Sequence, residues 1–257
     1  MLDSAALKVQ RASEHIETLV SLFQKNRPFG YVLETNTKTC QRATYAKRNE
    51  AVIQKAALIC GDVIHNLRSA LDHAYWQIVS PVATSESERK AIQFPFSETE
   101  AQLAASVKRR LAHKVSPSFY QAILDLKPHG EASGNEFLAL IHKFDILDKH
   151  KLLIPTGDYT RLSSEMLIRQ VPDFPLNLIN CSFGQNRRDI VWNIPPMNRE
   201  QRRAAKTPDS GIIEKELNVS VDIVFTGEGA THSRPVVPTL LKLVDAASTT
   251  LSIIKKA

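Results

Sequence analysis

The chain has 257 residues, a formal net charge of +6 at pH 7 and a hydrophobic fraction of 43%. This length allows one large domain or two small ones, and the positive charge permits nucleic-acid binding without requiring it. The three cysteines are widely spaced and form neither a zinc pattern nor a disulfide framework. No apolar run approaches the roughly 20 residues that span a bilayer, and the N-terminus lacks a signal-peptide pattern. We therefore expect a cytoplasmic protein with no membrane partner.

The first part of the chain predicts two helices separated by a β-hairpin. Apolar residues at three- and four-residue steps predict a helix over 3–25 and a long helix over 50–79. Between them, the alternation that includes Tyr31 and Leu33 predicts a hairpin over 30–47.

The middle of the chain predicts shorter helices, and the pattern becomes strand-like beyond residue 151. Segment 83–90 is polar and predicts a loop, and Ser133 is positioned to cap the helix that follows it. The predicted elements are helices over 98–113, 117–126, 134–149 and 236–256, and strands over 165–171, 176–183, 188–194 and 216–226.

The strand over 216–226 has the clearest alternation. Its apolar positions alternate with polar ones, so we expect all five to face the core. They are Leu217, Val219, Val221, Ile223 and Phe225.

Together these elements predict an α+β fold in which a helical bundle of four to five helices packs with a mainly antiparallel β-sheet. We expect a single domain over 1–257, because the early hairpin needs further strands to be stable. Within it, 1–151 is helix-rich, 152–235 is strand-rich and 236–256 is the C-terminal helix.

The long helix over 50–79 has an unusual polar face. No lysine or glutamate occurs between Lys55 and Glu86, although solvated helix faces usually carry both. The face instead carries short hydrogen-bonding side chains, namely Asp62, His65, Asn66, Ser69, Asp72 and His73. We expect this face to be enclosed by other protein groups or by a ligand.

A second unusual pattern lies on the helix over 134–149, where Asp145 and Asp148 continue an apolar stripe. Two carboxylates that face a core are costly unless they are paired. We expect both to be mostly buried and paired with an Arg or His of the helix over 50–79. His150 is placed to interact with the C-terminal end of its own helix.

Several segments of this chain resemble a family of uncharacterised bacterial proteins. The resemblance is carried by Gly61-Asp62, the run from His65 to His73, Phe94-Pro95-Phe96 and Asp148-Lys149-His150. It covers residues 1–155, includes a shared helix–hairpin–helix start, and implies no function, because the family has none assigned.

Arg68 and His73 also fit the spacing Arg-x-x-x-x-His, through which the chain distantly resembles HEPN domains. These helical modules include many RNases of toxin–antitoxin and phage-defence systems. The resemblance implies a metal-independent endoribonuclease that acts as a homodimer, a toxin or phage-defence effector without cofactor or metal. It implies that His73 transfers protons and that Arg68 stabilises the phosphorane formed when a ribose 2′-OH attacks the phosphate. Ser69 and the strand-rich half depart from the HEPN pattern.

Arg68 and His73 can act on the same phosphate only if the site has a particular geometry. Five residues of helix turn through about 500°, so the two side chains lie about 140° apart and share a site only if it wraps the helix, as at a subunit boundary.

We expect six further residues to support the catalytic pair: His65, Asn66, Asp72, Asp145, Asp148 and His150. Five basic residues are assigned to RNA binding: Lys108, Arg109, Arg110, Arg202 and Arg203.

Two other functions remain open from the sequence. The first is a metal-dependent hydrolase, because a metal site could form from one face of the helix over 50–79 together with residues of a facing helix. The residues of that face are Asp62, His65, Ser69 and Asp72, and Asp145, Asp148 and His150 could complete the site. The second is a non-catalytic oligomeric or partner-binding module whose polar helix face forms an interface. No nucleophile motif and no phosphate-binding glycine loop supports another class of enzyme.

Overall fold

A computed structural model describes residues 3–36, 42–158, 167, 169–170, 188–194, 198, 200, 211–218, 220–226 and 234–257. The contacts divide the chain into two compact units. Unit 1 comprises Met1–Leu22, Lys55–Ile154 and Phe225–Ala257, and unit 2 comprises Phe23–Gln54 and Pro155–Val224. The single domain over 1–257 stays a prediction.

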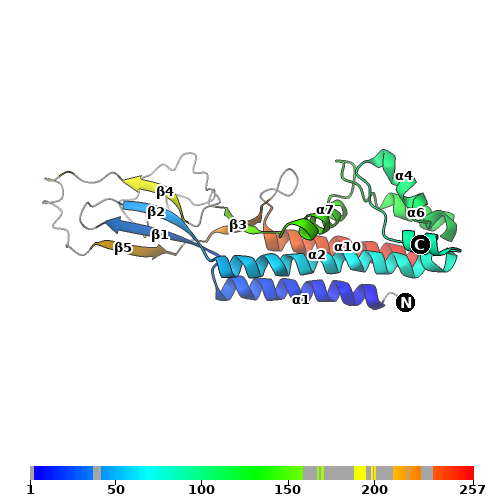
Figure 1. Cartoon of the computed structure of the whole chain (residues 1–257), viewed down its shortest axis with the longest axis horizontal. Coiled ribbons are helices and arrows are strands. Elements are labelled where there is room, and N and C mark those ends of the chain that lie inside the picture. Colours follow the sequence, from blue (N-terminus) through cyan, green and yellow to red (C-terminus); the bar gives the residue numbers. More distant parts are fainter. Residues whose placement is uncertain are drawn as a thin grey trace. The chain divides into compact units, whose positions relative to one another are not determined.

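The described residues confirm the α+β class, but they form eight α-helices where four to five were predicted. The helices are α1 (Asp3–Lys25), α2 (Glu50–Val79), α3 (Glu86–Ala91), α4 (Glu100–Arg109), α5 (Ala112–Val115), α6 (Pro117–Asp125), α7 (Glu136–His150) and α10 (Val236–Lys256), with a 3-10 turn, η1, at Ser80–Val82. Figure 1 labels most of them and colours all of them by position in the sequence.

The extra helices have local causes. Leu111 takes a left-handed conformation with φ of 70°, which divides the helix predicted over 98–113 into α4 and α5. The predicted loop over 83–90 contains α3, because the Ser85 hydroxyl accepts a hydrogen bond from the Glu88 amide and caps a short helix. The cap predicted at Ser133 is wrong, since the Asn135 side chain accepts from the Leu138 amide instead.

Unit 1 is built around the central part of α2. The apolar positions of that part are almost fully buried, among them Val63, Leu67 and Leu71. Helix α1 runs beside α2 (Figure 1), with a hydrogen bond from Gln77 to the Ser4 hydroxyl. Near the end of α2, the Tyr75 ring contacts Phe94 and Phe119 and its hydroxyl donates to the Arg110 carbonyl. Apolar burial of this kind is the main stabilising force of the unit.

Unit 2 contains a four-stranded antiparallel sheet with the order β4-β2-β1-β5. The predicted hairpin is confirmed, because Tyr31 of one strand pairs with Ala46 of the other. The strands of this sheet are β1 (Phe29–Asn36), β2 (Arg42–Arg48), β4 (Arg188–Ile194) and β5 (Ile212–Leu217), and a second, two-stranded sheet joins β3 (Pro155–Asp158) to β6 (Asp222–Phe225). The strand predicted over 188–194 is therefore confirmed, whereas most of 165–171 and all of 176–183 lie outside the described residues.

The predicted strand over 216–226 is wrong as a single element. It consists of the end of β5, an interruption, and β6 in the other sheet. Just after Leu217, the Asn218 amide donates to the Gln170 side chain, and its side-chain oxygen accepts from Arg27, so the backbone leaves the ladder. Consequently Val224 is buried beside Phe225, Val221 and Ile223 are only half-buried, and Val219 lies outside the described residues.

Helix α10 needs separate comment, because by length and composition it could cross a membrane, contrary to the expectation that no segment could. One such helix is weak evidence, since the core helices of water-soluble proteins pass the same test. Leu240, Leu243 and Ala247 of α10 are buried, and the helix packs against α7 and α6. The absence of a membrane partner and the cytoplasmic location stay predictions.

The close approach of α2 to α7 gives a test of this packing. A Cβ atom added at Gly61 would lie 2.5 Å from an Asp148 carboxylate oxygen. We predict that Gly61→Ala lowers the free energy of unfolding by about 1 kcal/mol, because overpacking outweighs the gain in helix propensity.

In an Asp148→Ala background the same substitution should raise stability, since only the propensity gain remains. Urea denaturation of the unchanged protein, the two single variants and the double variant measures these changes in stability. A stabilising effect of Gly61→Ala in the otherwise unchanged protein would contradict the observed packing.

Candidate functional site

The guanidinium of Arg68 lies inside unit 1, with only 7% of the residue exposed. Its Nη2 atom is 3.3 Å from an Asp72 carboxylate oxygen, one helical turn away on α2. The guanidinium also lies over the Phe96 ring, 4.5 Å from its centroid. The same oxygen of Asp72 accepts a hydrogen bond of 2.8 Å from the Phe94 amide. Arg68 and Asp72 therefore attach the Phe94-Pro95-Phe96 segment to α2.

The environment of this pair shifts the pKa of both groups. Burial lowers the pKa of Arg68, while the carboxylates of Asp72 and Asp145 oppose the shift. Burial raises the pKa of Asp72, against the charge of Arg68 and the Phe94 amide. The Nη1 atom of Arg68 is buried without a hydrogen-bond partner, so the guanidinium is only partly satisfied where it lies.

His73 lies on a different side of α2, where its side chain is exposed. The structure therefore does not bring Arg68 and His73 together within one chain, as their angular separation on the helix requires. His150, at the end of α7, is also exposed.

The outer side of α2 carries a line of residues, which we call the α2 stripe: Leu58, Asp62, His65, Ser69, His73 and Trp76. All of them are exposed except Ser69, which is half-buried; Leu58 is 58% and Trp76 is 43% exposed. The expectation that the polar face is enclosed is therefore wrong for Asp62, His65 and His73, whereas Asp72 is half-buried beside Arg68. Asn66 does turn inward, where it donates to the Asp62 carbonyl and accepts from Lys8.

The two acidic residues of α7 differ in burial. Asp145 is only 4% exposed, and it accepts a 2.7 Å hydrogen bond from Lys149 of its own helix. Its other oxygen lies 4.0 Å from Nδ1 of His65, so the expected link to α2 is present but long. Asp148 is half-buried against Gly61, with one carboxylate oxygen lacking a hydrogen-bond partner. Burial raises its pKa, and the charges of Asp145 and Asp62 act in the same direction.

Among the described residues, Asp148 forms no ion pair with an Arg or His of α2, and His65 acts on it only through an electrostatic interaction. The reason is local: Gly61 presents backbone instead of a side chain where the carboxylate lies against α2.

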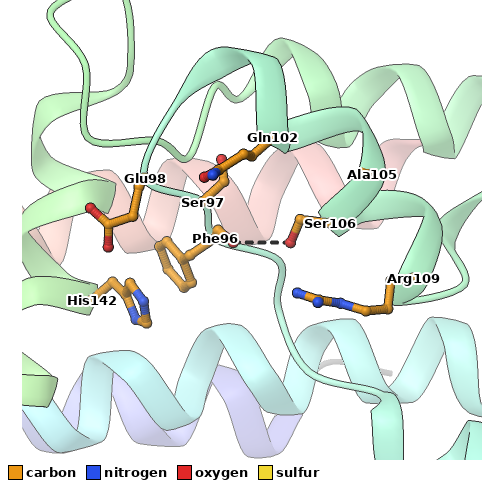
Figure 2. Close-up of a pocket in the computed structure, with 8 residues that line it drawn as sticks. All are labelled: Phe96, Ser97, Glu98, Gln102, Ala105, Ser106, Arg109 and His142. Carbon is orange, nitrogen blue, oxygen red and sulfur yellow. Dashed lines mark hydrogen bonds between the residues drawn. The ribbon is translucent and has the colours of Figure 1, made fainter.

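A pocket of about 510 Å³ opens between the segment after Phe96, α4 and α7 (Figure 2). Its lining includes Phe96, Ser97, Glu98, Gln102, Ala105, Ser106, Arg109 and His142. The Ser106 hydroxyl donates to the Phe96 carbonyl and fixes the floor of the pocket. Figure 2 shows Glu98 near His142 on one side of Phe96, and Arg109 on the other side.

His142 lies between this pocket and the Arg68 cluster, by which we mean Arg68, Asp72, Phe94 and Phe96. Its imidazole stacks on Phe96 at 4.6 Å with planes 8° apart, so Phe96 contacts both His142 and the Arg68 guanidinium. Burial lowers the pKa of His142, and the positive charge of Arg68 acts in the same direction. Its Nδ1 atom is buried with no hydrogen-bond partner. A neutral imidazole with an unused ring nitrogen is able to accept or donate a proton.

The basic residues assigned to RNA binding fall into three groups. Lys108 and Arg109 are exposed, and Arg109 lines the pocket. Arg110 is half-buried and donates to the Ala91 carbonyl, so its guanidinium stabilises a loop. Arg202 and Arg203 lie outside the described residues.

The sequence reasoning did not identify Glu98, Gln102 or His142. The Phe94-Pro95-Phe96 motif was a usable signal, because Glu98 lies two residues after it. His142 gave no signal, since one histidine near an apolar stripe is most often a core residue.

The residues of the metal-hydrolase hypothesis do not assemble. Within the described ranges, no three side chains of His, Cys, Asp or Glu gather closely enough to hold a metal ion. Comparison with known proteins adds no assignment: no family model, curated protein or solved structure matches the chain. The two family resemblances stay predictions.

Asp72 gives a direct test of the Arg68 cluster. We predict that Asp72→Ala lowers the free energy of unfolding by about 2–4 kcal/mol, because it leaves the Arg68 cation and the Phe94 amide without a partner. Because Asp72 is partly exposed, the loss of unfolding free energy should be smaller than for a fully buried pair.

The double variant Arg68→Met with Asp72→Ala should recover part of the loss, and Asp125→Ala, an exposed aspartate on α6, should change stability little. Denaturation midpoints in urea give the values. A loss no larger than that of Asp125→Ala would mean that the cluster contributes nothing to stability.

The lowered pKa of His142 predicts a pH dependence with a definite sign. At a pH below about 6.5, the ordinary pKa of histidine, His142 binds a proton in the unfolded chain more readily than in the folded protein. Stability should therefore fall as the pH decreases from about 6.5 through the folded pKa, and His142→Gln should reduce that fall.

Thermal unfolding between pH 7.5 and 5 measures the effect, with His113→Gln on α5 as the control for loss of an imidazole. Parallel pH profiles for His142→Gln and the unchanged protein would refute the assignment.

Proposed function

We propose that this chain is a metal-independent, HEPN-like ribonuclease that acts as a homodimer, with the α2 stripe as the subunit interface. The observation that supports it is the exposure of that stripe. A helix face that carries exposed Leu58 and Trp76, and no Lys or Glu over its length, has the composition of an interface rather than of a solvated surface. His73 lies on this face.

The order of residues along the stripe suits pairing with a second copy of itself. Leu58 and Trp76 are separated by about 27 Å of helix, with acidic and imidazole side chains between them. In an antiparallel arrangement about a two-fold axis near Leu67, Leu58 faces Trp76 of the partner subunit and Asp62 faces the partner's His73. An isologous contact of this kind repeats each favourable pair twice.

In the proposed reaction the ribose 2′-oxygen attacks the adjacent phosphorus. His73 takes the proton of the 2′-OH, the bond from phosphorus to the 5′-oxygen breaks, and the imidazolium returns the proton to that leaving oxygen. Asp62 of the partner subunit would orient the ring of His73, as a carboxylate does for many catalytic histidines.

The part assigned to Arg68 requires a rearrangement. Its guanidinium is buried between Asp72 and Phe96, so it reaches a phosphate only after leaving Asp72. A phosphate dianion or phosphodiester competes for a guanidinium through the same paired hydrogen bonds as a carboxylate. Arg68 would then stabilise the charge of the phosphorane.

The closed Arg68–Asp72 contact favours a second candidate function, a non-catalytic homodimeric module. In that case the α2 stripe is an interface and Arg68 is a structural residue. Both functions require the dimer, and they differ only in RNA cleavage.

Cleavage of single-stranded RNA in the presence of EDTA tests the first function. We predict activity that persists with EDTA and falls by about 10²–10⁴-fold in His73→Ala, because a positioned acid–base group contributes that much. His113→Ala removes an exposed imidazole from α5 and should keep full activity.

Light scattering after gel filtration gives a second readout from the same proteins. Trp76→Glu should convert the dimer to a monomer, whereas Leu241→Glu, at an exposed position of α10, should not. A dimer without EDTA-resistant cleavage supports the non-catalytic module, and a monomeric protein without cleavage excludes both functions.

A further inference from the structure

We propose that the pocket between the segment after Phe96, α4 and α7 binds a guanosine nucleotide, with Glu98 reading the base and Arg109 holding the phosphate. This inference deepens the proposed function, on which its biological meaning rests, by naming the nucleotide that the protein selects in RNA. The binding itself is measurable without any cleavage.

The polar groups at the two sides of the pocket have opposite charge. Glu98 lies near His142 on one side of Phe96, and Arg109 lies on the other (Figure 2). Among the described residues, the side chains of Glu98, Gln102 and Arg109 form no hydrogen bond or ion pair with the protein. A ligand that fits this arrangement carries an anion at one end and hydrogen-bond donors at the other.

The floor between these ends is rigid and partly apolar. Phe96 is held on its faces by Arg68 and His142, and its carbonyl accepts from the buried Ser106 hydroxyl. Because this part of the pocket is already ordered, ligand binding costs less conformational entropy. The volume of about 510 Å³ lies in the usual range for sites of small organic ligands.

The carboxylate of Glu98 selects among the bases. Guanine presents two adjacent donors, N1–H and the N2 amine, and a carboxylate accepts both in a paired geometry that is strong and directional. Adenine and cytosine each present a single amine beside an acceptor nitrogen, which would face the carboxylate unfavourably. Glu98 therefore favours guanine, and discrimination is large because a mismatched base leaves charged groups unpaired.

Arg109 and Gln102 act on the rest of the nucleotide. The Arg109 guanidinium pairs with phosphate oxygens through its planar set of donors. The amide of Gln102, which also lines the pocket, can donate to a ribose or base oxygen. The ligand class is thus a guanosine monophosphate unit, either free or within single-stranded RNA.

Calorimetric titration with 5′-GMP, AMP and IMP tests the assignment. We expect GMP to bind at least about tenfold more tightly than AMP, because one charge-assisted hydrogen bond is worth that factor or more. IMP lacks the N2 amine and should bind between the two. Equal affinity for GMP and AMP, or for GMP and IMP, would overturn the role of Glu98.

Substitutions at two exposed positions, Glu98 and Arg109, test the two ends of the site independently. Glu98→Gln should abolish the preference for GMP over AMP, and Arg109→Ala should weaken GMP while leaving the affinity for guanosine unchanged. Lys143→Ala removes an exposed cation of α7, next to His142, that does not line the pocket, so this variant should bind GMP normally. A loss in Lys143→Ala equal to that in Arg109→Ala would reduce the contact to general electrostatic attraction and overturn the phosphate site.

The outcomes remain distinct from those of the proposed function. Selective GMP binding without RNA cleavage would keep the guanosine site and remove the ribonuclease, whereas cleavage without selective GMP binding would do the reverse.

Discussion

The contact of Arg68 with Asp72 and Phe96 is the interaction on which the arrangement of the helical unit depends. It neutralises a buried cation, ties the Phe94-Pro95-Phe96 segment to α2, and sets the ring on which His142 stacks. A buried charge is tolerated only when it is paired and hydrogen-bonded. Phe96, which this contact positions, forms part of the pocket lining.

The two sides of α2 have different surroundings. On the inner side, Arg68 and Asn66 organise the packing of unit 1. On the outer side, the α2 stripe carries His73 and Trp76 without a covering element in the described chain. The pocket is lined by the segment from Phe96 to Glu98, by α4 and by His142 of α7, and the inner side of α2 reaches it through the contact of Arg68 with Phe96. The surface that we propose as a subunit interface lies on the outer side of the same helix.

Much of the helical framework could be predicted because its signals are local. The bounds of α2 follow from an apolar period that runs from Ile53 to Ile78 and ends before Pro81. The hairpin of β1 and β2 follows from alternation around a polar turn. The predicted strand over 216–226 failed because the alternation continues across a break, which is caused by side chains distant in sequence, Gln170 and Arg27. The site was predicted least well, since Phe96 and His142 meet only through the packing of α7.

The sequence by itself determined the long helices and the first hairpin, and that α2 has a face without lysine or glutamate, because these properties depend on neighbouring residues. Only the tertiary structure decided that Arg68 is buried while His73 is exposed, and that Glu98, Arg109 and His142 border one pocket. The physical reason is that burial and pairing depend on contacts between residues far apart in the chain. A pattern on one helix shows which residues share a face, but not what lies against that face.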